Sequence, residues 1–248
     1  MISFLPFRKF NVQDTGLWTG MTEMHCHLLP GVDDGVETKE QALRILRFME
    51  EEVRVRRVCI TPHTMMDFNN APGERLHGIF QRFLPAWDGK IELHIASEYM
   101  IDSYFSKRLS EGLLSLGIQN QRRLVLVELP TMMCPLDWET TMERIFEMGY
   151  TPVIAHPERY RYIHVDYCRA WRERGCLLQL NLPSLHGYYG KHIEKQAFQL
   201  LDDELYGFAG FDIHRYEGYA AVVRQLSLSR KRMDKLAKLL DNGRKLEF

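Results

Sequence analysis

Short apolar runs recur along the chain and alternate with stretches in which apolar residues are spaced three or four positions apart. Short runs of this kind are typical of buried strands, and the wider spacing is typical of helices with one buried face. The strands we predict lie at residues 22–24, 58–60, 91–96, 124–127, 153–155, 177–180 and 208–211. The alternation of strands and helices predicts an α/β fold built around a mostly parallel sheet.

The helices predicted between these strands have recognisable ends. Thr38 and Gln41 have the spacing of a capping box, in which each side chain bonds the backbone N–H of the other residue. Gly149 and Gly175 stand where helices commonly end, because glycine readily adopts the left-handed conformation found after a last helical turn. We predict helices after residue 38, at residues 139–148, 168–174 and 191–201, and over most of 217–241.

The composition indicates one folded unit without a general affinity for polyanions. The 248 residues, 45% of them hydrophobic, can bury one sizeable core, and we expect a single domain at residues 21–248 after an N-terminal extension at residues 1–20. Lys and Arg total 32 against 33 Asp and Glu, so we expect no nucleic-acid partner. No run approaches the roughly 20 apolar residues of a spanning helix, so we expect no membrane insertion.

The cysteines indicate a reducing compartment. The chain has five cysteines, an odd number with no CxxC pair, which fits free thiols better than a disulfide framework. Residues 1–20 also lack the apolar stretch of a signal peptide. We therefore expect a cytoplasmic protein.

One cysteine has the C-x5-R spacing of cysteine-dependent phosphatases. Cys168 and Arg174 show this spacing, but the residues between them contain no glycine and are predicted to be helical. The amides of a helix are occupied by its own hydrogen bonds, so this segment is not expected to cradle phosphate.

Side chains that commonly bind metals follow six of the seven predicted strands. The carboxyl ends of parallel strands meet at one end of such a fold, so these side chains are expected to converge. His25 and His27 also lie two positions apart on one strand and therefore point to the same face. Imidazole and carboxylate groups without thiolate suit Mn²⁺, Fe or Zn²⁺. The residues are His25, His27, His63, Glu98, Glu128, His156, Asp212 and His214.

Four longer strings around these residues resemble the PHP superfamily. They are His-Cys-His-Leu-Leu-Pro-Gly-Val-Asp-Asp-Gly at 25–35, Thr-Pro-His at 61–63, Ala-His-Pro-Glu-Arg-Tyr at 155–160 and Asp-Ile-His at 212–214. Within that superfamily the chain resembles the CpsB/CapC family, the metal-dependent bacterial tyrosine-protein phosphatases of capsular and exopolysaccharide biosynthesis. The likeness runs from about residue 21 to residue 240.

The resemblance implies a PHP-type distorted (βα)7, TIM-like barrel that holds about three metal ions, with manganese first and iron or zinc as alternatives. By resemblance, one ion is held by His25, His27, Glu98 and Asp212. Glu98 would bridge to a second ion held by Glu128 and His156. The third ion would be held by Asp34, His63 and His214, with Asp33 as the competing choice beside Asp34.

The resemblance also implies a reaction and a partner. Arg159 matches the arginine that binds substrate in the family and is the candidate catalytic residue; its alternative is a salt bridge with Glu158 or another surface acid. The implied substrate is protein phosphotyrosine, on the tail of a bacterial tyrosine kinase that controls polysaccharide export. Three other functions remain open: a small-molecule phosphatase of the histidinol-phosphate type, a metal-dependent amidohydrolase, and a catalytically impaired kinase-binding module.

Two features distinguish this chain from the usual family pattern. Phe211 stands where the family commonly has Ser or Thr, and Arg215 begins an altered segment at residues 215–218.

Tyr188, Tyr189 and Trp18 are candidates for a recognition surface.

Overall fold

All seven predicted strands are present in the computed structural model, which describes residues 8–66 and 73–248. Each strand covers a predicted apolar run with small differences at its ends. They are β2 (Thr22–Cys26), β3 (Arg57–Ile60), β5 (Glu92–Ile95), β8 (Arg122–Glu128), β9 (Tyr150–Ala155), β10 (Leu177–Asn181) and β11 (Phe208–Gly210).

These strands form two sheets in which nearly all neighbours are parallel. One sheet has the order β2-β3-β5, and the other has the order β11-β10-β9-β8-β6-β4. The second sheet includes the short strands β4 (His63–Thr64) and β6 (Glu98–Met100), while β7 (Gly117–Gln119) pairs antiparallel with β8. The predicted α/β fold with a mostly parallel arrangement is confirmed, and the strand pairing divides it between two sheets.

The division coincides with breaks at the ends of two of the predicted strands. The chain that forms β3 is interrupted at Thr61 and Pro62 before it continues as β4, and Pro62 has no N–H to donate to a neighbouring strand. The chain of β5 is similarly interrupted at Ala96 and Ser97 before β6, and the Ser97 hydroxyl donates to the Pro62 carbonyl (2.8 Å). Each interruption separates a strand from the site residue that follows it.

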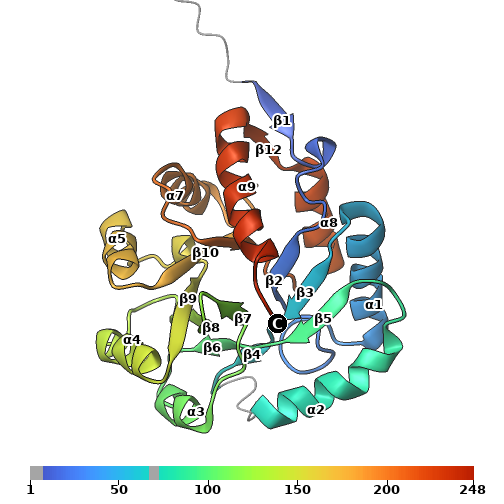
Figure 1. Cartoon of the computed structure of the whole chain (residues 1–248). Coiled ribbons are helices and arrows are strands. Elements are labelled where there is room, and N and C mark those ends of the chain that lie inside the picture. The colour runs from blue at the N-terminus through green and yellow to red at the C-terminus, as the bar shows by residue number, and fades with distance from the viewer. Residues whose placement is uncertain (1–7, 67–72) are drawn as a thin grey trace, which may run out of the picture.

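Helices surround the strands on all sides in Figure 1. They are α1 (Lys39–Phe48), α2 (Gly73–Phe83), α3 (Phe105–Glu111), α4 (Trp138–Glu147), α5 (Val165–Glu173), α6 (Leu182–Leu185), α7 (Lys191–Asp202), α8 (Tyr216–Gln225) and α9 (Arg230–Arg244). Thr38 and Gln41 form the predicted capping box at the start of α1. Helices α2, α3 and α6 were not predicted. Single turns of 3₁₀ or π-helix occur at Gln13–Thr15, Met49–Val53, Leu84–Ala86 and Pro157–Arg159.

The predicted helical structure over most of 217–241 is confirmed, but it is divided between two helices. Helices α8 and α9 are separated by the strand β12 (Ser227–Ser229), which pairs antiparallel with β1 (Lys9–Asn11). Phe10 lies opposite Leu228 in this pair, and the Leu228 side chain is buried. Backbone pairing and this burial stabilise an extended segment between two helical ones. Residues 8–20 of the expected extension are thus in contact with the rest of the fold, whereas residues 1–7 lie outside the described ranges.

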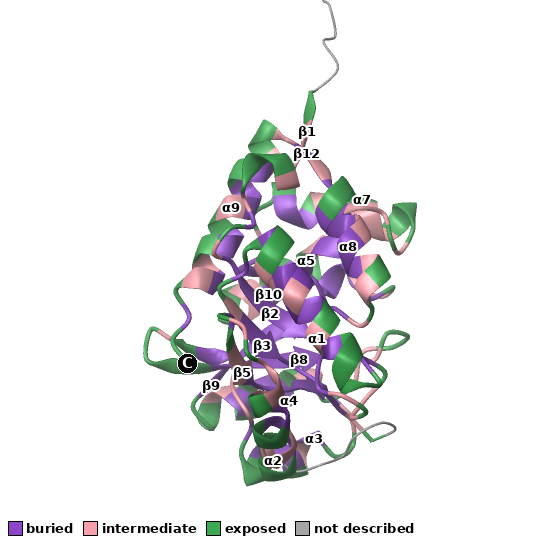
Figure 2. Ribbon diagram, turned by 90° about the vertical axis from the view of Figure 1, so that its right-hand side faces the viewer, coloured by how far each residue is buried: buried purple, intermediate pink, exposed green. Residues whose placement is uncertain are grey.

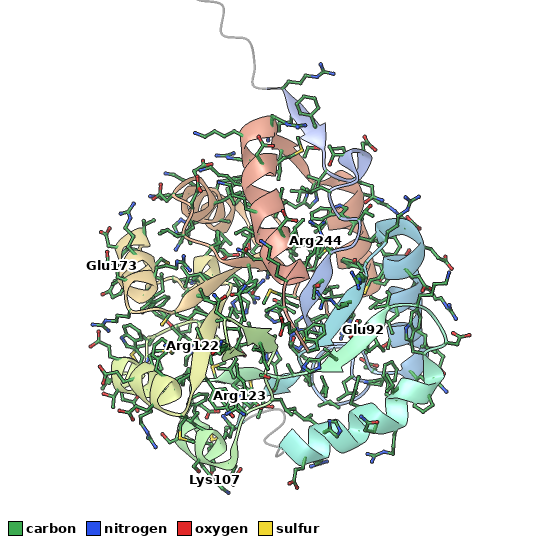
Figure 3. The ribbon with its side chains drawn as sticks, in the orientation of Figure 1. Glu92, Lys107, Arg122, Arg123, Glu173 and Arg244 are labelled. Carbon is green, nitrogen blue, oxygen red and sulfur yellow. The ribbon has the colours of Figure 1, made fainter. Side chains whose placement is uncertain are left out.

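The interior is apolar, and most charge lies outside it. Figure 2 shows the central strands as buried and the outward faces of the helices as exposed. In Figure 3 the labelled side chains of Lys107 on α3 and Glu173 on α5 lie at the edge of the molecule. A second, smaller apolar cluster joins strands of both sheets. It consists of Met24, Cys59, Ala96, Leu116, Leu124, Leu126, Val153, Ala155, Phe208 and Leu246.

The C-terminal residues cover the end of the strands opposite the predicted site. Glu247 forms an antiparallel bridge with Ile118 of β7, and the ring of Phe248 stacks on His94, with centroids 4.6 Å apart. His94 also bonds the carbonyl of Ser115 (2.9 Å), so this histidine is a packing residue, as its position within a strand run predicts.

All five cysteines are free, and four of them are buried. Cys168 lies within α5, as predicted, so the C-x5-R spacing falls on a helix. None of the helices in the described ranges combines the length and the apolar character that crossing a bilayer requires.

Candidate metal centre

The residues predicted to bind metals come together at the carboxyl ends of the strands. Within each of three groups, one potential ligand atom per residue lies within 4.8 Å of the others. One group contains four residues that all lie in buried positions. The groups are His25, His27, Glu98 and Asp212; His27, Asp34, His63 and His214; and His63, Glu98 and Glu128.

The first group has the composition predicted for the first ion. The Nε2 atom of His25 lies 3.1 Å from Glu98 Oε2 and 3.3 Å from Asp212 Oδ1. The Nε2 atom of His27 lies 3.2 Å from Asp212 Oδ1 and 3.5 Å from Glu98 Oε2. Two imidazoles and two carboxylates therefore converge on one small volume.

The second group contains the three residues predicted for the third ion, together with His27. Asp34 Oδ1 lies 3.6 Å from His63 Nε2 and 3.4 Å from His214 Nε2. The rings of His27 and His214 stack with centroids 4.0 Å apart. Asp34 is exposed, with 46% of its side chain accessible, so this group lies at the open side of the cluster.

Asp33, the competing choice, has a different position. Its Oδ2 lies 2.7 Å from His27 Nδ1 and accepts a hydrogen bond from the backbone N–H of His63 (2.8 Å). Its Oδ1 accepts from the N–H of Gly35 (3.0 Å). Burial alone would raise the pKa of Asp33, but His27 and the two backbone N–H groups lower it to about 2. Asp33 therefore holds the His27 ring and the loop, while Asp34 faces the group.

The third group differs from the prediction for the second ion. His63 Nδ1 lies 2.9 Å from Glu128 Oε1 and 3.1 Å from Glu98 Oε2, so His63 takes the place expected for His156. His156 is nevertheless beside the group, because its Nε2 lies 3.0 Å from Glu98 Oε1 and 4.0 Å from Glu128 Oε2.

The residues of the cluster fit bound cations. Glu98 Oε2, Glu128 Oε1 and Asp212 Oδ1 are buried, and none has a hydrogen-bond partner among the described residues. Imidazole nitrogens lie 2.9–3.5 Å from these oxygens, but a buried carboxylate oxygen that accepts no hydrogen bond is costly, and a cation would satisfy it.

Two residues of the cluster, Glu98 and His156, have charge states that suit a metal, whereas the nearby carboxylates, against the effect of burial, raise the pKa values of His25, His27 and His63. Burial raises the pKa of Glu98, but His25 and His63 lower it well below its usual value, so this carboxyl is ionised. Burial, reinforced by the nearby Arg159, lowers the pKa of His156 to about 4, so this imidazole is neutral at pH 7. Ionised carboxylates and neutral imidazoles are the forms that bind metals.

Two buried residues that the sequence analysis did not select support these side chains. The Gln179 amide oxygen lies 3.1 Å from His25 Nδ1 and accepts from the His156 N–H (3.3 Å). Glu23 Oε1 accepts from the backbone N–H groups of His25 (2.9 Å) and Phe211 (3.0 Å). An amide oxygen can only accept, so Gln179 places the His25 proton on Nδ1 and leaves Nε2 free to face the carboxylates.

Two site residues have a strained backbone. His156 has φ 33° and Asp212 has φ 52°, values in the left-handed region that residues with a Cβ seldom adopt. Such strain persists where surrounding contacts enforce it. Gln179 accepts from the N–H of His156, and Glu23 accepts from the N–H just before Asp212. The two buried side chains therefore help to fix the backbone where it is strained.

Arg159 lies beside the cluster and pairs with one of its carboxylates. It ends the 3₁₀ turn Pro157–Arg159, and its NH1 donates to Asp212 Oδ2 (2.6 Å). Its expected alternative partner, Glu158, is buried elsewhere and accepts from the Asn181 N–H (2.9 Å) and the Tyr206 hydroxyl (3.0 Å). The pair of Arg159 with Glu158 is therefore not observed.

The unusual residues of the chain have packing and positioning roles. Phe211 is buried between Trp18 and Tyr219, with ring centroids 5.3 and 4.8 Å away. Trp18 is therefore part of the core, and its inclusion in a recognition surface was wrong. Arg215 NH1 donates to the carbonyls of Asp34 (2.9 Å) and Gly35, so it ties the loop of Asp34 to the segment after His214.

The fold and the site together define an α/β protein with a buried histidine and carboxylate centre suited to more than one metal ion. A sequence model of the family described as "Capsular polysaccharide synthesis, CpsB/CapC" matches residues 21–239. The chain belongs to the CpsB/CapC family.

Named relatives are similar to the chain over most of its length. The tyrosine-protein phosphatase CpsB of Streptococcus pneumoniae is 27% identical over 91% of this chain and 98% of its own length. The tyrosine-protein phosphatase YwqE of Bacillus subtilis is 27% identical over 78% of this chain and 77% of its own. A crystal structure from work on YwqE and CpsB, described as unique metal-dependent tyrosine phosphatases, has a TM-score of 0.70 and 26% identity, covering 92% of this chain and 96% of that one.

Proposed function

We propose that the protein is a metal-dependent phosphatase that hydrolyses protein phosphotyrosine. The observation that carries the proposal is the buried group of His25, His27, Glu98 and Asp212, with Arg159 bonded to its outermost carboxylate. The relatives that share this fold are named tyrosine-protein phosphatases, and a structural neighbour is described as metal-dependent.

We further propose how the ions are held. Mn²⁺ is the proposed ion, with Fe or Zn²⁺ as alternatives that the same donor atoms would accept. The three groups of potential ligands would hold about three ions. Bound ions would supply a water molecule of lowered pKa and positive charge for the phosphate oxygens. The ligand sets are His25, His27, Glu98 and Asp212; Glu98, Glu128 and His156, with His63 adjoining; and Asp34, His63 and His214.

Arg159 is the proposed catalytic residue of the chain. Only its NH1 is bonded to another described residue, Asp212, so the rest of the planar guanidinium can reach a phosphate. A guanidinium neutralises the charge that spreads over the phosphoryl oxygens in the transition state. The leaving phenol of tyrosine has a pKa near 10, which reduces the need for a general acid, and we assign none.

We also propose that residues 21–248 act as one domain in which the two sheets form a distorted (βα)7 barrel. The apolar cluster shared by both sheets supports this proposal. A parallel bridge between Cys26, at the end of β2, and Ile213, just beyond β11, joins the sheets on one side. On the other side, the chain runs directly from β3 into β4 and from β5 into β6, so two continuous segments pass from one sheet to the other.

The proposed substrate is the phosphotyrosine-bearing tail of a bacterial tyrosine kinase in the cytoplasm. The description of the family as one of capsular polysaccharide synthesis supports a role in that process. The five free cysteines are compatible with a reducing compartment. Purified kinase with a phosphorylated tail should lose its phosphate when the metal-loaded protein is added, and an unchanged phosphorylation level would contradict this partner.

The function is tested by metal removal and reconstitution. The protein freed of metal with a chelator should release no phosphate from a phosphotyrosyl peptide, and Mn²⁺ should restore the reaction. The same peptide bearing phosphoserine, and histidinol phosphate, serve as comparison substrates. Preference for histidinol phosphate, or no turnover with at least two ions bound per chain by elemental analysis, would contradict the proposal.

A second prediction concerns Gln179. Replacing it with leucine should lower the affinity for metal about 10- to 100-fold, the usual cost of removing a residue that orients a ligand. Metal titration followed by elemental analysis measures the effect, with Gln81→Leu on the exposed face of α2 as the matched control. Equal metal affinity in both variants would show that Gln179 does not orient His25.

A further inference from the structure

A cavity of about 250 Å³ lies next to the metal-ligand cluster. Asp212 and His214 line it on the side of the cluster, and Arg159, Tyr188 and Tyr189 line it elsewhere. The carboxylate that faces the imidazoles and the guanidinium proposed to bind phosphate thus border the same space as two tyrosine rings.

Tyr189 is held firmly at the wall of this cavity. The guanidinium carbon of Arg159 lies 4.6 Å from the centre of the Tyr189 ring. The Tyr189 hydroxyl accepts a hydrogen bond from Asn181 Nδ2 (3.3 Å), and the same Nδ2 donates to Asp212 Oδ2 (3.1 Å). Tyr189 is therefore linked through Arg159 and Asn181 to the carboxylate of Asp212.

Tyr188 extends this aromatic wall towards solvent. Its ring meets that of Tyr189 edge to face, with centroids 5.0 Å apart and an interplanar angle of 80°. Tyr188 is 62% exposed, so part of its ring remains open to solvent beside the cavity. One ring is thus fixed next to Arg159, and the next is accessible to a ligand.

Gly218 keeps the cavity open on the side facing Tyr188. A Cβ atom at this position would lie 3.6 Å from the Tyr188 ring, and Gly218 lines the cavity from within α8. An added Cβ would make only an ordinary van der Waals contact at this distance, so alanine would fit here, whereas a larger side chain would extend into the cavity.

We propose that Tyr188 and Tyr189 bind the phenol ring of phosphotyrosine and thereby determine specificity. This inference rests on the proposed function, and it identifies how an aryl phosphate is distinguished from an alkyl one. With the phosphate at Arg159 and the metal-ligand cluster, the ring attached to its ester oxygen lies in the adjoining cavity. Aromatic rings attract one another in edge-to-face and offset arrangements, whereas the side chain of phosphoserine has no ring to contribute.

The test compares tyrosine variants of the metal-loaded protein. Tyr188→Ala and Tyr189→Leu are each expected to raise KM for a phosphotyrosyl peptide by up to about tenfold, with a smaller change in kcat, because ring contacts are made before and during the reaction. Tyr189→Phe keeps the ring and should stay near wild type. Tyr167→Ala, on the exposed side of α5, is the control. Inorganic phosphate is the probe without a ring, so its inhibition constant should rise less than KM.

A variant at Gly218 gives an independent measurement. Gly218→Leu should place a side chain in the space for the phenol ring and raise KM for the peptide more than it raises the inhibition constant of phosphate. If wild type hydrolyses the peptide and all these variants keep its KM within twofold, the ring site is overturned while the phosphatase function stands. If metal-loaded wild type hydrolyses no phosphotyrosyl peptide, the proposed function itself fails.

Discussion

Replacing Asp212 with alanine is expected to lower phosphate release from a phosphotyrosyl peptide about a thousand-fold or more. Asp212 Oδ1 lies close to the Nε2 atoms of both His25 and His27, and Oδ2 receives the bond from Arg159. The substitution removes a proposed ligand and releases the arginine. A metal ion contributes several kcal/mol to the stability of such a transition state, and each 1.36 kcal/mol is a factor of ten in rate.

Asp212→Asn separates this loss from a change in the backbone. Asparagine tolerates the left-handed conformation of position 212 better than alanine does, so this variant keeps the local fold while it removes the charge. Both variants should also contain less metal by elemental analysis. Asp166→Ala on the exposed face of α5 is the matched control. Robust turnover by Asp212→Ala, or by the companion variant His156→Ala, would overturn the proposed site.

The convergence of the cluster could be predicted because its residues follow buried strands. Parallel strands end on one side of the fold, so residues at or just after the ends of β2, β8 and β11 must lie near one another whatever their separation along the chain. The convergence of His25, His27, Glu98 and Asp212 was predictable for this reason, whereas their assignment to one ion came from the family resemblance. Which of two neighbours faces the cluster, Asp33 or Asp34, depends on the loop conformation, and spacing alone did not decide it.

The residues that the sequence analysis missed depend on contacts between distant segments. Gln179 lies inside β10 and meets His25 only because the strands pack together. Glu23 lies two residues before His25 on β2, and its distant contact is with the backbone N–H of Phe211. Their signal was a polar residue within an otherwise apolar run, which is expensive to bury unless it has a structural partner. Likewise, β12 is extended because β1 pairs with it, although its flanking residues favour a helix. The secondary-structure propensity of a short segment does not reveal which distant segment it contacts.

The sequence also did not predict which aromatic side chains are buried and which are exposed. Trp18 and Tyr188 both lie within two residues of glycines in the sequence. Trp18 is nevertheless buried against Phe211, whereas Tyr188 is exposed. Phe211 replaces a hydroxyl residue common in the family, and its ring fills space between Trp18 and Tyr219. The phenylalanine at position 211 therefore serves core packing next to Asp212. This role can be recognised only when the neighbours of the ring are known.

Replacing Arg159 is expected to abolish most of the activity while leaving the metal in place. Arg159→Ala should lower kcat/KM for a phosphotyrosyl peptide about a thousand-fold, the lower end of the contribution of an arginine that stabilises a phosphoryl transition state. Arg159→Lys should recover only part of this loss, because an ammonium group cannot bond Asp212 and a phosphate in the planar, two-pronged manner of a guanidinium. Arg159 belongs to none of the three ligand groups, so elemental analysis should find wild-type metal content in both variants.

Arg174→Ala, which removes a surface pair with Glu139, is the control for these arginine variants. Activity within tenfold of wild type in Arg159→Ala would mean that the guanidinium serves Asp212 and makes no contact with the phosphate.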